Sequence, residues 1–375
     1  MNRRSLLPAA VVLCLAVRAL FAQDRARPAI PSDPEIEVVP VASGVYAVLR
    51  SQHPDEQPGH GNSVIIINDD DVVVVDATRM PSQARKIIAV VRALTDKPVR
   101  TLVHTHWHDD HVYGNQAFAE AFPGLEIVAH QNAREDMLTI SLPRNLPGYQ
   151  KDYPAYVAQI EERLKSDTPG AATLSPEAKG RLQRIAARIR REIEELPTLH
   201  PILPNMTFDT SLTLYRGSRE IRLLHFGRAN TRGDTVVYLP KEKVVAAGDM
   251  IVSPVPYAHG SYMSDWIAAN RKLAALDAEV IIPGHGRIQR DKNYLALETE
   301  LIESLVRQVR GSVERGLSLE DTRKALDLES FKEKMAGGDK QRASDFDSYF
   351  VAPASARAYK EARGEPLGAS PYEDN

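Results

Sequence analysis

Residues 105–111 read Thr105-His106-Trp107-His108-Asp109-Asp110-His111, directly after an apolar run. On an extended backbone, side chains two positions apart point to the same side, so His106 and His108 can reach one cation from the end of a strand. Asp110 and His111 follow as the chain turns, where they are placed to hold a second cation. Neutral imidazole nitrogen and carboxylate oxygen are donors typical of zinc sites. The stretch therefore predicts a metal site at a strand end rather than a polar surface loop.

Two later segments share this arrangement, an apolar strand that ends in a potential ligand. Residues 244–247 lead into Gly248-Asp249, whose carboxylate can bridge two cations. Residues 280–282 lead into Pro283-Gly284-His285-Gly286, where the glycines let the backbone turn sharply around one histidine. Either segment alone would fit a structural turn. Together with the first stretch they predict one shared site made of His106, His108, Asp110, His111, Asp249 and His285.

Apolar runs along the chain alternate with patterns typical of helices. A helix is expected over residues 82–95, because Ile87, Ile88, Val91 and Leu94 then share one face. Strands that alternate with helices indicate an α/β fold built in layers. Strands are expected at residues 45–50, 63–68, 72–75, 100–104, 211–215, 220–225, 235–239, 244–247 and 280–282.

Two further segments are expected to be helical. Residues 140–200 resemble a helical insertion, in which Ser175 suits an N-cap, Pro176 suits the first helical position, and residues 182–196 carry an apolar stripe. Residues 293–375 begin with a helical pattern and are expected to form a C-terminal extension. The domain that carries the metal site then covers residues 36–292. A hydrophobic content of 43% and a charged content of 26% are ordinary for a globular chain of this length.

The first 22 residues differ from the rest of the chain. Arg3 and Arg4 precede a nearly continuous apolar run from Leu6 to Leu15, and small residues follow up to Ala22. That order is typical of a secretory signal peptide, and the run is shorter than the roughly 20 residues that a membrane span needs. We therefore expect an exported protein, periplasmic or secreted, without a stable membrane span after cleavage. The arginine pair leaves both Sec and twin-arginine export open, and residues 23–35 are expected to form a flexible lead-in.

Charge and cysteine content argue against two kinds of site. Without residues 1–22 the chain keeps 44 basic and 50 acidic residues, a net charge of −6, and no strong basic patch, so nucleic acid is not expected as a partner. The only cysteine, Cys14, lies in the expected signal peptide, which excludes disulfides and thiolate metal ligands from the mature chain. The expected partner is a small-molecule substrate, and the composition indicates no particular oligomeric state.

The motif His-x-His-x-Asp-His at residues 106–111, with Asp249 and His285, resembles the metallo-β-lactamase fold superfamily. The resemblance covers residues 40–290 and includes Gly61-Asn62-Ser63 and Asp76. It implies a four-layered αβ/βα sandwich with a pair of metal ions, as Zn²⁺, in a cleft along one sheet edge. It is much less specific for substrate, since the superfamily includes lactamases, lactonases, thioesterases, phosphodiesterases, sulfatases and iron-dependent oxygenases.

One position departs from the pattern of this family. Residues 226–234 resemble the loop that supplies a third histidine to the first metal, and that histidine would fall at Asn230. An amide oxygen is a poorer zinc ligand than imidazole. We therefore expect a weak first site, with His106, His108 and a poor third donor, beside a tight second site with Asp110, His111, Asp249 and His285. The nearby His225 is expected to be a structural residue rather than a replacement ligand.

The expected activity follows from the metal pair. A divalent ion lowers the pKa of bound water from 15.7 toward about 7 and so supplies hydroxide at neutral pH. We expect an exported zinc-dependent hydrolase that acts on an ester, amide or lactam, phosphoester or sulfate-type bond, and the resemblance assigns Asp110 the task of orienting the water and taking its proton. A non-catalytic metal or ligand binder of this fold and an iron-dependent oxygenase remain as alternatives. Substrate contacts are expected from Arg228, Arg232, Tyr257, His259 and Tyr262.

Overall fold

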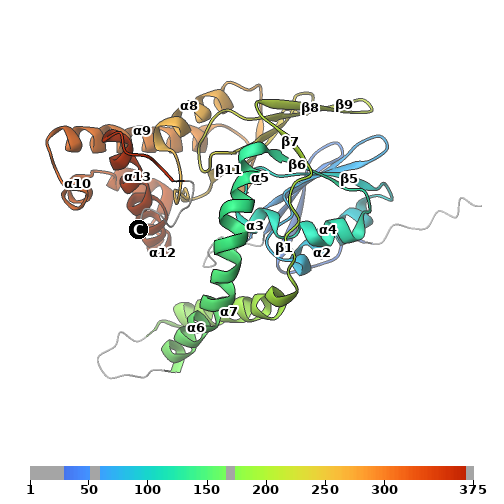
Figure 1. The fold of residues 1–375 in the computed structure, drawn as a ribbon, viewed down its shortest axis with the longest axis horizontal. Coiled ribbons are helices and arrows are strands. Elements are labelled where there is room, and N and C mark those ends of the chain that lie inside the picture. Colours follow the sequence, from blue (N-terminus) through green and yellow to red (C-terminus); the bar gives the residue numbers. More distant parts are fainter. Residues whose placement is uncertain (1–28, 51–59, 166–173, 369–375) are drawn as a thin grey trace, which may run out of the picture.

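The computed structural model describes residues 29–50, 60–165 and 174–368, and within them two β-sheets form the centre of the molecule (Figure 1). The larger sheet has the strand order β1-β2-β3-β4-β5-β6-β7, and the smaller sheet has the order β12-β11-β10-β9-β8. The strands of the larger sheet are β1 (Ile36–Ala42), β2 (Val45–Arg50), β3 (Ser63–Ile67), β4 (Val72–Val75), β5 (Val99–Val103), β6 (Glu126–His130) and β7 (Met206–Phe208). Those of the smaller sheet are β8 (Ser211–Arg216), β9 (Arg219–Leu224), β10 (Val236–Leu239), β11 (Val244–Val252) and β12 (Val280–His285).

The two sheets pack face to face, and helices cover their outer faces. The core between them combines side chains of both sheets, among them Val64, Val73, Leu223, Val237 and Ile282. Helices α2 (Pro81–Leu94) and α4 (Asn115–Ala121) cover the larger sheet, and α8 (Met263–Ala274) and α9 (Asn293–Glu314) cover the smaller one. The order helix, sheet, sheet, helix confirms the predicted four-layered αβ/βα sandwich.

Strand β4 illustrates why the apolar runs form the central strands. Successive side chains point to opposite faces of a sheet, so Val73 and Val75 enter the core between the sheets while Val72 and Val74 face the helical layer. Because both faces are covered, a continuous run of β-branched residues is stable there. Strands β4 and β5 are parallel, so their carboxyl ends open at the same edge of the sheet. The predicted metal-binding stretch begins at that edge.

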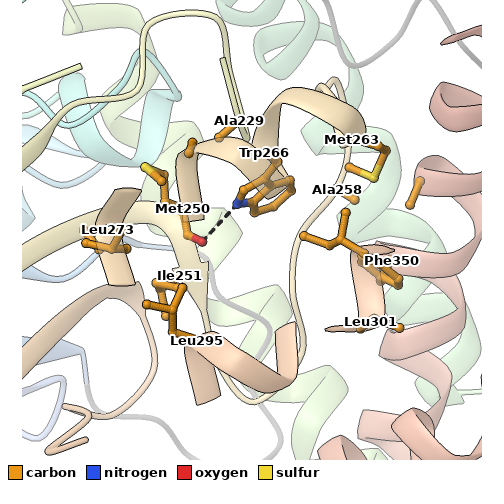
Figure 2. Packing of buried hydrophobic residues seen from close by; sticks show 14 of the residues in the cluster. Ala229, Met250, Ile251, Ala258, Met263, Trp266, Leu273, Leu295, Leu301 and Phe350 are labelled. Atoms are coloured by element: carbon orange, nitrogen blue, oxygen red, sulfur yellow. Dashed lines mark hydrogen bonds between the residues drawn. The ribbon is translucent and has the colours of Figure 1, made fainter. Parts of the chain in front are cut away.

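A large apolar cluster fixes β11 against the helices that follow it (Figure 2). Trp266 of α8 is fully buried, and its Nε1 donates a hydrogen bond to the backbone carbonyl of Met250 at 3.3 Å. Phe350 joins the same cluster from the C-terminal region, which is helical as predicted. Since Met250 follows Asp249, this packing fixes the strand that carries a predicted ligand. The C-terminal region contains α9, α10 (Leu319–Ala325), α11 (Glu329–Ala336), α12 (Lys340–Asp345), η3 (Phe346–Val351) and α13 (Ala352–Ala362).

The predicted helical insertion consists of α5 (Gln131–Asp136), η1 (Met137–Asn145), α6 (Leu146–Lys165), α7 (Pro176–Glu195) and η2 (Leu196–Thr198). Helices α6 and α7 pack against each other through an apolar cluster that includes Ile160 and Ile189, and they project from the sandwich as an arm (Figure 1). Ser175 caps α7 by accepting a hydrogen bond from Ala178 N–H at 3.2 Å, as predicted. Helical structure begins at Gln131 rather than near residue 140, because the His130 side chain already caps α5.

The structure adds three strands that the sequence does not predict, β1, β6 and β7. Strand β1 lies at the edge of its sheet, where Pro40 is tolerated because an edge strand can spare one N–H group. Strand β7, at the opposite edge, has three residues. Strand β6 lies inside the sheet, between β5 and β7, and has five residues.

The end of the predicted lead-in is anchored rather than loose. Lys86 of α2 contacts Asp33 at 2.8 Å and Glu35 at 2.6 Å, and Arg191 of α7 contacts Glu35 at 2.8 Å. The predicted signal peptide, residues 1–22, and residues 23–28 lie outside the described residues. Among the helices that the structure describes, none combines the length and apolarity needed to cross a bilayer.

Candidate metal centre

The six predicted ligands come from segments far apart in the sequence and meet at one end of the sheets. His106 and His108 follow β5, and Asp110 and His111 lie in the short helix α3 (Asp109–Val112). Asp249 lies in β11, and His285 is the last residue of β12. Strands β11 and β12 are parallel neighbours, which brings their ligands to the same end.

His106, His108 and one oxygen of Asp249 form a group that we call the first subsite. His106 Nε2 lies 3.6 Å from Asp249 Oδ2, and His108 Nδ1 lies 4.0 Å from the same oxygen. The rings of the two histidines meet edge to face, with centroids 4.6 Å apart. The two histidines follow the end of β5, as their spacing predicts, whereas Asp249 lies within β11, which continues to Val252.

The other oxygen of Asp249 belongs to a second subsite, with Asp110, His111 and His285. Asp249 Oδ1 lies 3.3 Å from His111 Nε2 and 3.6 Å from His285 Nε2. Asp110 Oδ2 lies 3.0 Å from His285 Nε2, and the Nε2 atoms of His111 and His285 are 3.3 Å apart. The carboxylate of Asp249 therefore faces both subsites, as a bridging ligand must.

The donor set fits divalent cations in size and chemistry. Donors bound at about 2.0–2.2 Å around a tetrahedral ion lie roughly 3.3–3.6 Å apart, close to the separations between these side chains. His106 Nε2 and Asp249 Oδ1 are buried and have no hydrogen-bond partner. Buried polar atoms without partners are costly, and a coordinated cation would satisfy both.

Residues behind the ligands fix the orientation of the imidazole rings. His111 Nδ1 lies 2.9 Å from Asp76 Oδ2, which leaves Nε2 for the second subsite. Asp76 also accepts hydrogen bonds from the N–H and hydroxyl groups of Thr105, at 2.9 and 2.7 Å. The Thr105 hydroxyl lies 2.9 Å from His106 Nδ1, which leaves Nε2 of His106 for the first subsite. Such partners set the tautomer and direction of metal-binding histidines.

The electrostatic environment of the two buried histidines differs. Burial opposes a charge on His111, but Asp249, Asp110 and Asp76 outweigh it and raise the pKa of this ring. Burial and the neighbouring charge of His111 lower the pKa of His106 to about 4. The carboxylates therefore make the second subsite the more strongly cation-attracting of the two.

Two glycines are required by close approach to the ligands. A Cβ atom at Gly61 would lie 2.3 Å from the ring of His111, and one at Gly284 would lie 2.0 Å from Asp249 Oδ1. Asn62, next to Gly61, donates hydrogen bonds through Nδ2 to the carbonyls of Pro283 and Gly286, both at 3.0 Å. These contacts tie the entry of β3 to the loop that carries His285.

Comparison with known families agrees with this geometry. The model of the "Metallo-beta-lactamase superfamily" matches residues 57–285, more than half of the chain. The chain belongs to the metallo-β-lactamase superfamily. Members of this superfamily are mostly metal-dependent hydrolases, and the six predicted ligands all lie within the matched residues.

Three similar proteins place this member of the superfamily among its relatives. A linear primary-alkylsulfatase of Pseudomonas sp. is 25% identical over 254 residues, which cover 64% of this chain and 43% of the relative. The alpha subunit of a 2,4-dinitroanisole O-demethylase of Nocardioides sp. is 22% identical over 256 residues, which cover 68% of this chain and 58% of the relative. This chain thus spans about half the length of these relatives. A solved metallo-β-lactamase from Pontibacter korlensis, 18% identical, has a TM-score of 0.50 over 72% of this chain and 99% of that one, a likeness of fold.

Asn230 is linked to the first subsite of this metallo-β-lactamase superfamily member through Tyr257. Its Nδ2 donates a hydrogen bond to the carbonyl of Tyr257 at 2.6 Å, and the Tyr257 ring meets the His108 ring edge to face, with centroids 6.0 Å apart. The Oδ1 atom of Asn230 is buried and has no hydrogen-bond partner. His225 instead binds the Asp234 carbonyl through Nδ1 at 2.8 Å and stacks on His130, in agreement with a structural role.

The structure separates the predicted substrate contacts into two groups. Tyr257 flanks His108, and His259 lies against Tyr257 with ring centroids 4.9 Å apart. Arg228 pairs with Asp265 at 2.6 Å, and Arg232 pairs with the buried Asp136 at 2.7 Å. Tyr262 is 2% exposed, and the centre of its ring lies 4.4 Å from the guanidinium carbon of Arg228 and 5.0 Å from that of Arg357. These partners favour a structural role for Arg228, Arg232 and Tyr262, and their contact with substrate stays a prediction.

The sequence gives no sign of two features near the centre. The carboxylate of Asp109, between two ligands, accepts hydrogen bonds from Asn145 at 2.7 Å and from the Tyr149 hydroxyl at 2.8 Å, both in the insertion. Tyr349 of η3 lies 5.9 Å from the Tyr257 ring, and its carbonyl accepts a hydrogen bond from Ala258 N–H at 2.8 Å. Insertion and C-terminal region thus both reach the site, and no local pattern reveals contacts between such distant segments.

Proposed function

We propose that this chain is a hydrolase that holds two divalent cations, with zinc as the expected metal. The observation that carries the proposal is the carboxylate of Asp249, whose two oxygens face two different sets of histidines. When bound, such cations lower the pKa of water and polarise the oxygen of a scissile bond. The donors are nitrogen and carboxylate oxygen only, a set that zinc accepts readily.

Asp110 is the residue that we assign to proton transfer. Its Oδ2 faces His285 at 3.0 Å, and its side chain is 17% exposed, more than any other ligand side chain. Burial opposes its ionised form, but His111 and His285 outweigh this effect and lower the pKa of Asp110, which keeps the carboxylate charged. An ionised carboxylate with one oxygen at the metals can orient a water and accept its proton through the other.

We also propose that the two subsites differ in affinity. The second subsite offers two imidazoles and two carboxylates, whereas the first offers two imidazoles, one carboxylate oxygen and the amide oxygen of Asn230. Dialysis against a mild chelator, followed by metal analysis, tests this difference. We expect close to one zinc ion per chain to remain, and two retained ions would contradict the proposal.

The substrate that we propose is an ester, with a sulfate-type ester as the first candidate. The 25% identity with an alkylsulfatase supports this choice, and the aromatic side chains of Tyr257 and Tyr349 beside the centre suit an apolar leaving group. The test is a screen with chromogenic sulfate, phosphodiester, carboxylic ester and lactam substrates, with and without added zinc. Zinc-dependent turnover of one class confirms the hydrolase, and a zinc-loaded protein that turns over none of them contradicts it.

Export belongs to the same proposal. The apolar run in residues 6–15 after Arg3 and Arg4 supports a signal peptide that is removed near Ala22. Expression of the full chain in a Gram-negative host, followed by fractionation and N-terminal sequencing, tests it. We expect the mature protein outside the cytoplasm, beginning just after Ala22, and an uncleaved cytoplasmic chain would contradict it.

A further inference from the structure

A strained turn lies between β4 and the metal centre. Asp76 and Thr78 have φ angles of +59° and +62°, which L-residues seldom adopt. The turn is held by hydrogen bonds from Ala77 N–H to the His111 carbonyl at 2.7 Å and from Gly114 N–H to the Thr78 carbonyl at 3.0 Å. Asp76 in this turn supports His111, and the next side chain after Thr78 is Arg79.

Arg79 lies against the segment that carries the metal ligands. Its guanidinium carbon is 4.6 Å from the centre of the Tyr149 ring, and Tyr149 donates its hydroxyl hydrogen to Asp109 at 2.8 Å. Arg79 Nη2 donates a hydrogen bond to the Tyr153 hydroxyl at 2.8 Å. Burial opposes the charge, but Tyr153, Tyr149, Glu192 and Asp110 together raise the pKa of Arg79, which is consistent with this placement beside Asp110.

The charge of Arg79 is not matched by a close carboxylate. Among the described residues, only Glu192 has a carboxylate within 4.0 Å of Arg79, at 3.8 Å from Nε, which is too far for a hydrogen bond. Glu192 also faces Arg188 at 3.6 Å and His60 at 3.4 Å, and neither of its oxygens has a hydrogen-bond partner. The Arg79 side chain is only 12% exposed.

This group, which we call the Arg79 cluster, consists of Arg79, Arg188, Glu192 and His60 and carries an excess of positive charge. Burial lowers the pKa of His60 to about 4, so this ring is neutral at pH 7. Within this cluster two guanidinium groups face one carboxylate, so one positive charge depends on an acidic group outside it, Asp110 at the metal centre. Such a charge is costly without a counter-ion. His60 also precedes Gly61, which lies against the ring of His111, so the cluster adjoins the second subsite.

We propose that Arg79, supported by Arg188, binds an oxyanion group of the substrate beside the metal centre. The chemical class is a sulfate, phosphate or carboxylate carried by the molecule that is cleaved. Guanidinium groups match the geometry of these anions, and hydrogen bonds between charged groups are the strongest that a protein forms. As a statement about substrate, this inference rests on the proposed hydrolase, but oxyanion binding itself can be measured without turnover.

The first test is calorimetric binding of inorganic sulfate, inorganic phosphate and acetate to protein from which all metal has been removed with a strong chelator, as checked by metal analysis. Arg79→Gln is expected to weaken binding of the preferred anion about 10- to 100-fold. The matched control is Arg85→Gln, because Arg85 is 57% exposed and pairs with Glu120 and Glu195 on the surface. Unchanged anion binding in Arg79→Gln, or equal losses in both variants, would overturn the proposal.

The second test separates anion recognition from folding. With zinc-loaded enzyme, Arg79→Gln is expected to raise KM about tenfold or more for p-nitrophenyl sulfate or phosphate, and to change KM for neutral p-nitrophenyl acetate less than about threefold. Equal losses on charged and neutral esters would instead indicate a structural role. If Arg79→Gln does not fold, Arg188→Gln serves in its place, because Arg188 is 23% exposed, and weaker anion binding is again expected.

The two tests also keep the inference distinct from the proposed function. Anion binding that depends on Arg79, in a protein without esterase activity, would contradict the hydrolase and retain the site. Ester hydrolysis with anion binding that is insensitive to Arg79 would contradict the site and retain the hydrolase.

Discussion

Replacement of Asp76 by asparagine tests how the second subsite is built. Asp76 is 2% exposed and accepts hydrogen bonds from Thr105 N–H and the Thr105 hydroxyl, and its Oδ2 faces His111 Nδ1 at 2.9 Å. An asparagine of the same shape can place its NH₂ group at one of these positions. If that group faces His111, Nδ1 must become an acceptor, and the proton moves to Nε2, the atom that faces the second subsite. The ring then no longer presents a lone pair to a cation.

The expected effect of Asp76→Asn is a loss of zinc affinity by about 10- to 100-fold, which is the usual effect of removing a residue that supports a metal-binding histidine. This corresponds to about 1.4–2.8 kcal/mol of binding free energy. Zinc dissociation constants are measured by competition with a chromogenic chelator at pH 7. The control is Asp71→Asn. Asp71 is also buried, at 6% exposure, but it precedes the first residue of β4, at the end of the strand away from the metal centre, where it contacts Asn68 and Arg216. Equal zinc affinity in wild type and Asp76→Asn would refute the reasoning.

Three further changes test other parts of the site. Asp110→Ala is expected to abolish turnover of whichever ester the enzyme accepts, and activity within about tenfold of wild type would reject its role in proton transfer. Asn230→His is expected to restore a third imidazole to the first subsite, so that metal analysis after dialysis finds two zinc ions per chain instead of one. Burial opposes the ionised form of Glu192, but His60 and Arg79 outweigh this effect and lower the pKa of Glu192 to about 2. The contribution of Glu192 to the free energy of unfolding is therefore present above pH 4.5 and is lost as the pH falls toward 2. Urea unfolding at several pH values is expected to show that the free energy of unfolding falls less steeply over this pH range in Glu192→Gln than in the wild type. Identical pH profiles of the two proteins would contradict this expectation.

The sequence was sufficient to predict which residues gather at the candidate metal centre, because each one lies beside a strong local pattern. His106 follows the buried strand β5 and His285 is the last residue of the buried strand β12, and parallel strands bring their carboxyl ends to one edge. Asp249 was equally visible, since the apolar run of β11 leads directly to it. The strands β1 and β7 gave weaker patterns because edge strands are short or half exposed. What could not be predicted was the set of long-range contacts, such as that between Asp109 and Tyr149.

Two of the predicted substrate contacts also show that long-range contacts could not be predicted from the sequence. Arg228 and Arg232 flank Asn230 in the sequence and were predicted to contact substrate. In the structure each already has a carboxylate within hydrogen-bond distance, Asp265 for Arg228 and Asp136 for Arg232. Both acids lie far from their arginines along the chain, so no local pattern could reveal the pairing. Arg79 differs from these two arginines. No sequence pattern points to it, but among the described residues no carboxylate lies closer to it than 3.8 Å.

The insertion therefore does more than extend the fold. Helix α6 supplies Tyr149, which contacts both Asp109 and Arg79, and helix α7 supplies Glu192 and Arg188, which set the charge around Arg79. The predicted metal ligands lie in or after strands of the sandwich, whereas Tyr149, Arg188 and Glu192 around Arg79 come from the insertion. Because these two parts are separate in the sequence, insertion residues can change without altering any metal ligand. A change of substrate by replacement of α6 and α7 residues is therefore chemically simpler than a change of metal, since it leaves the bridging carboxylate of Asp249 and its histidines untouched.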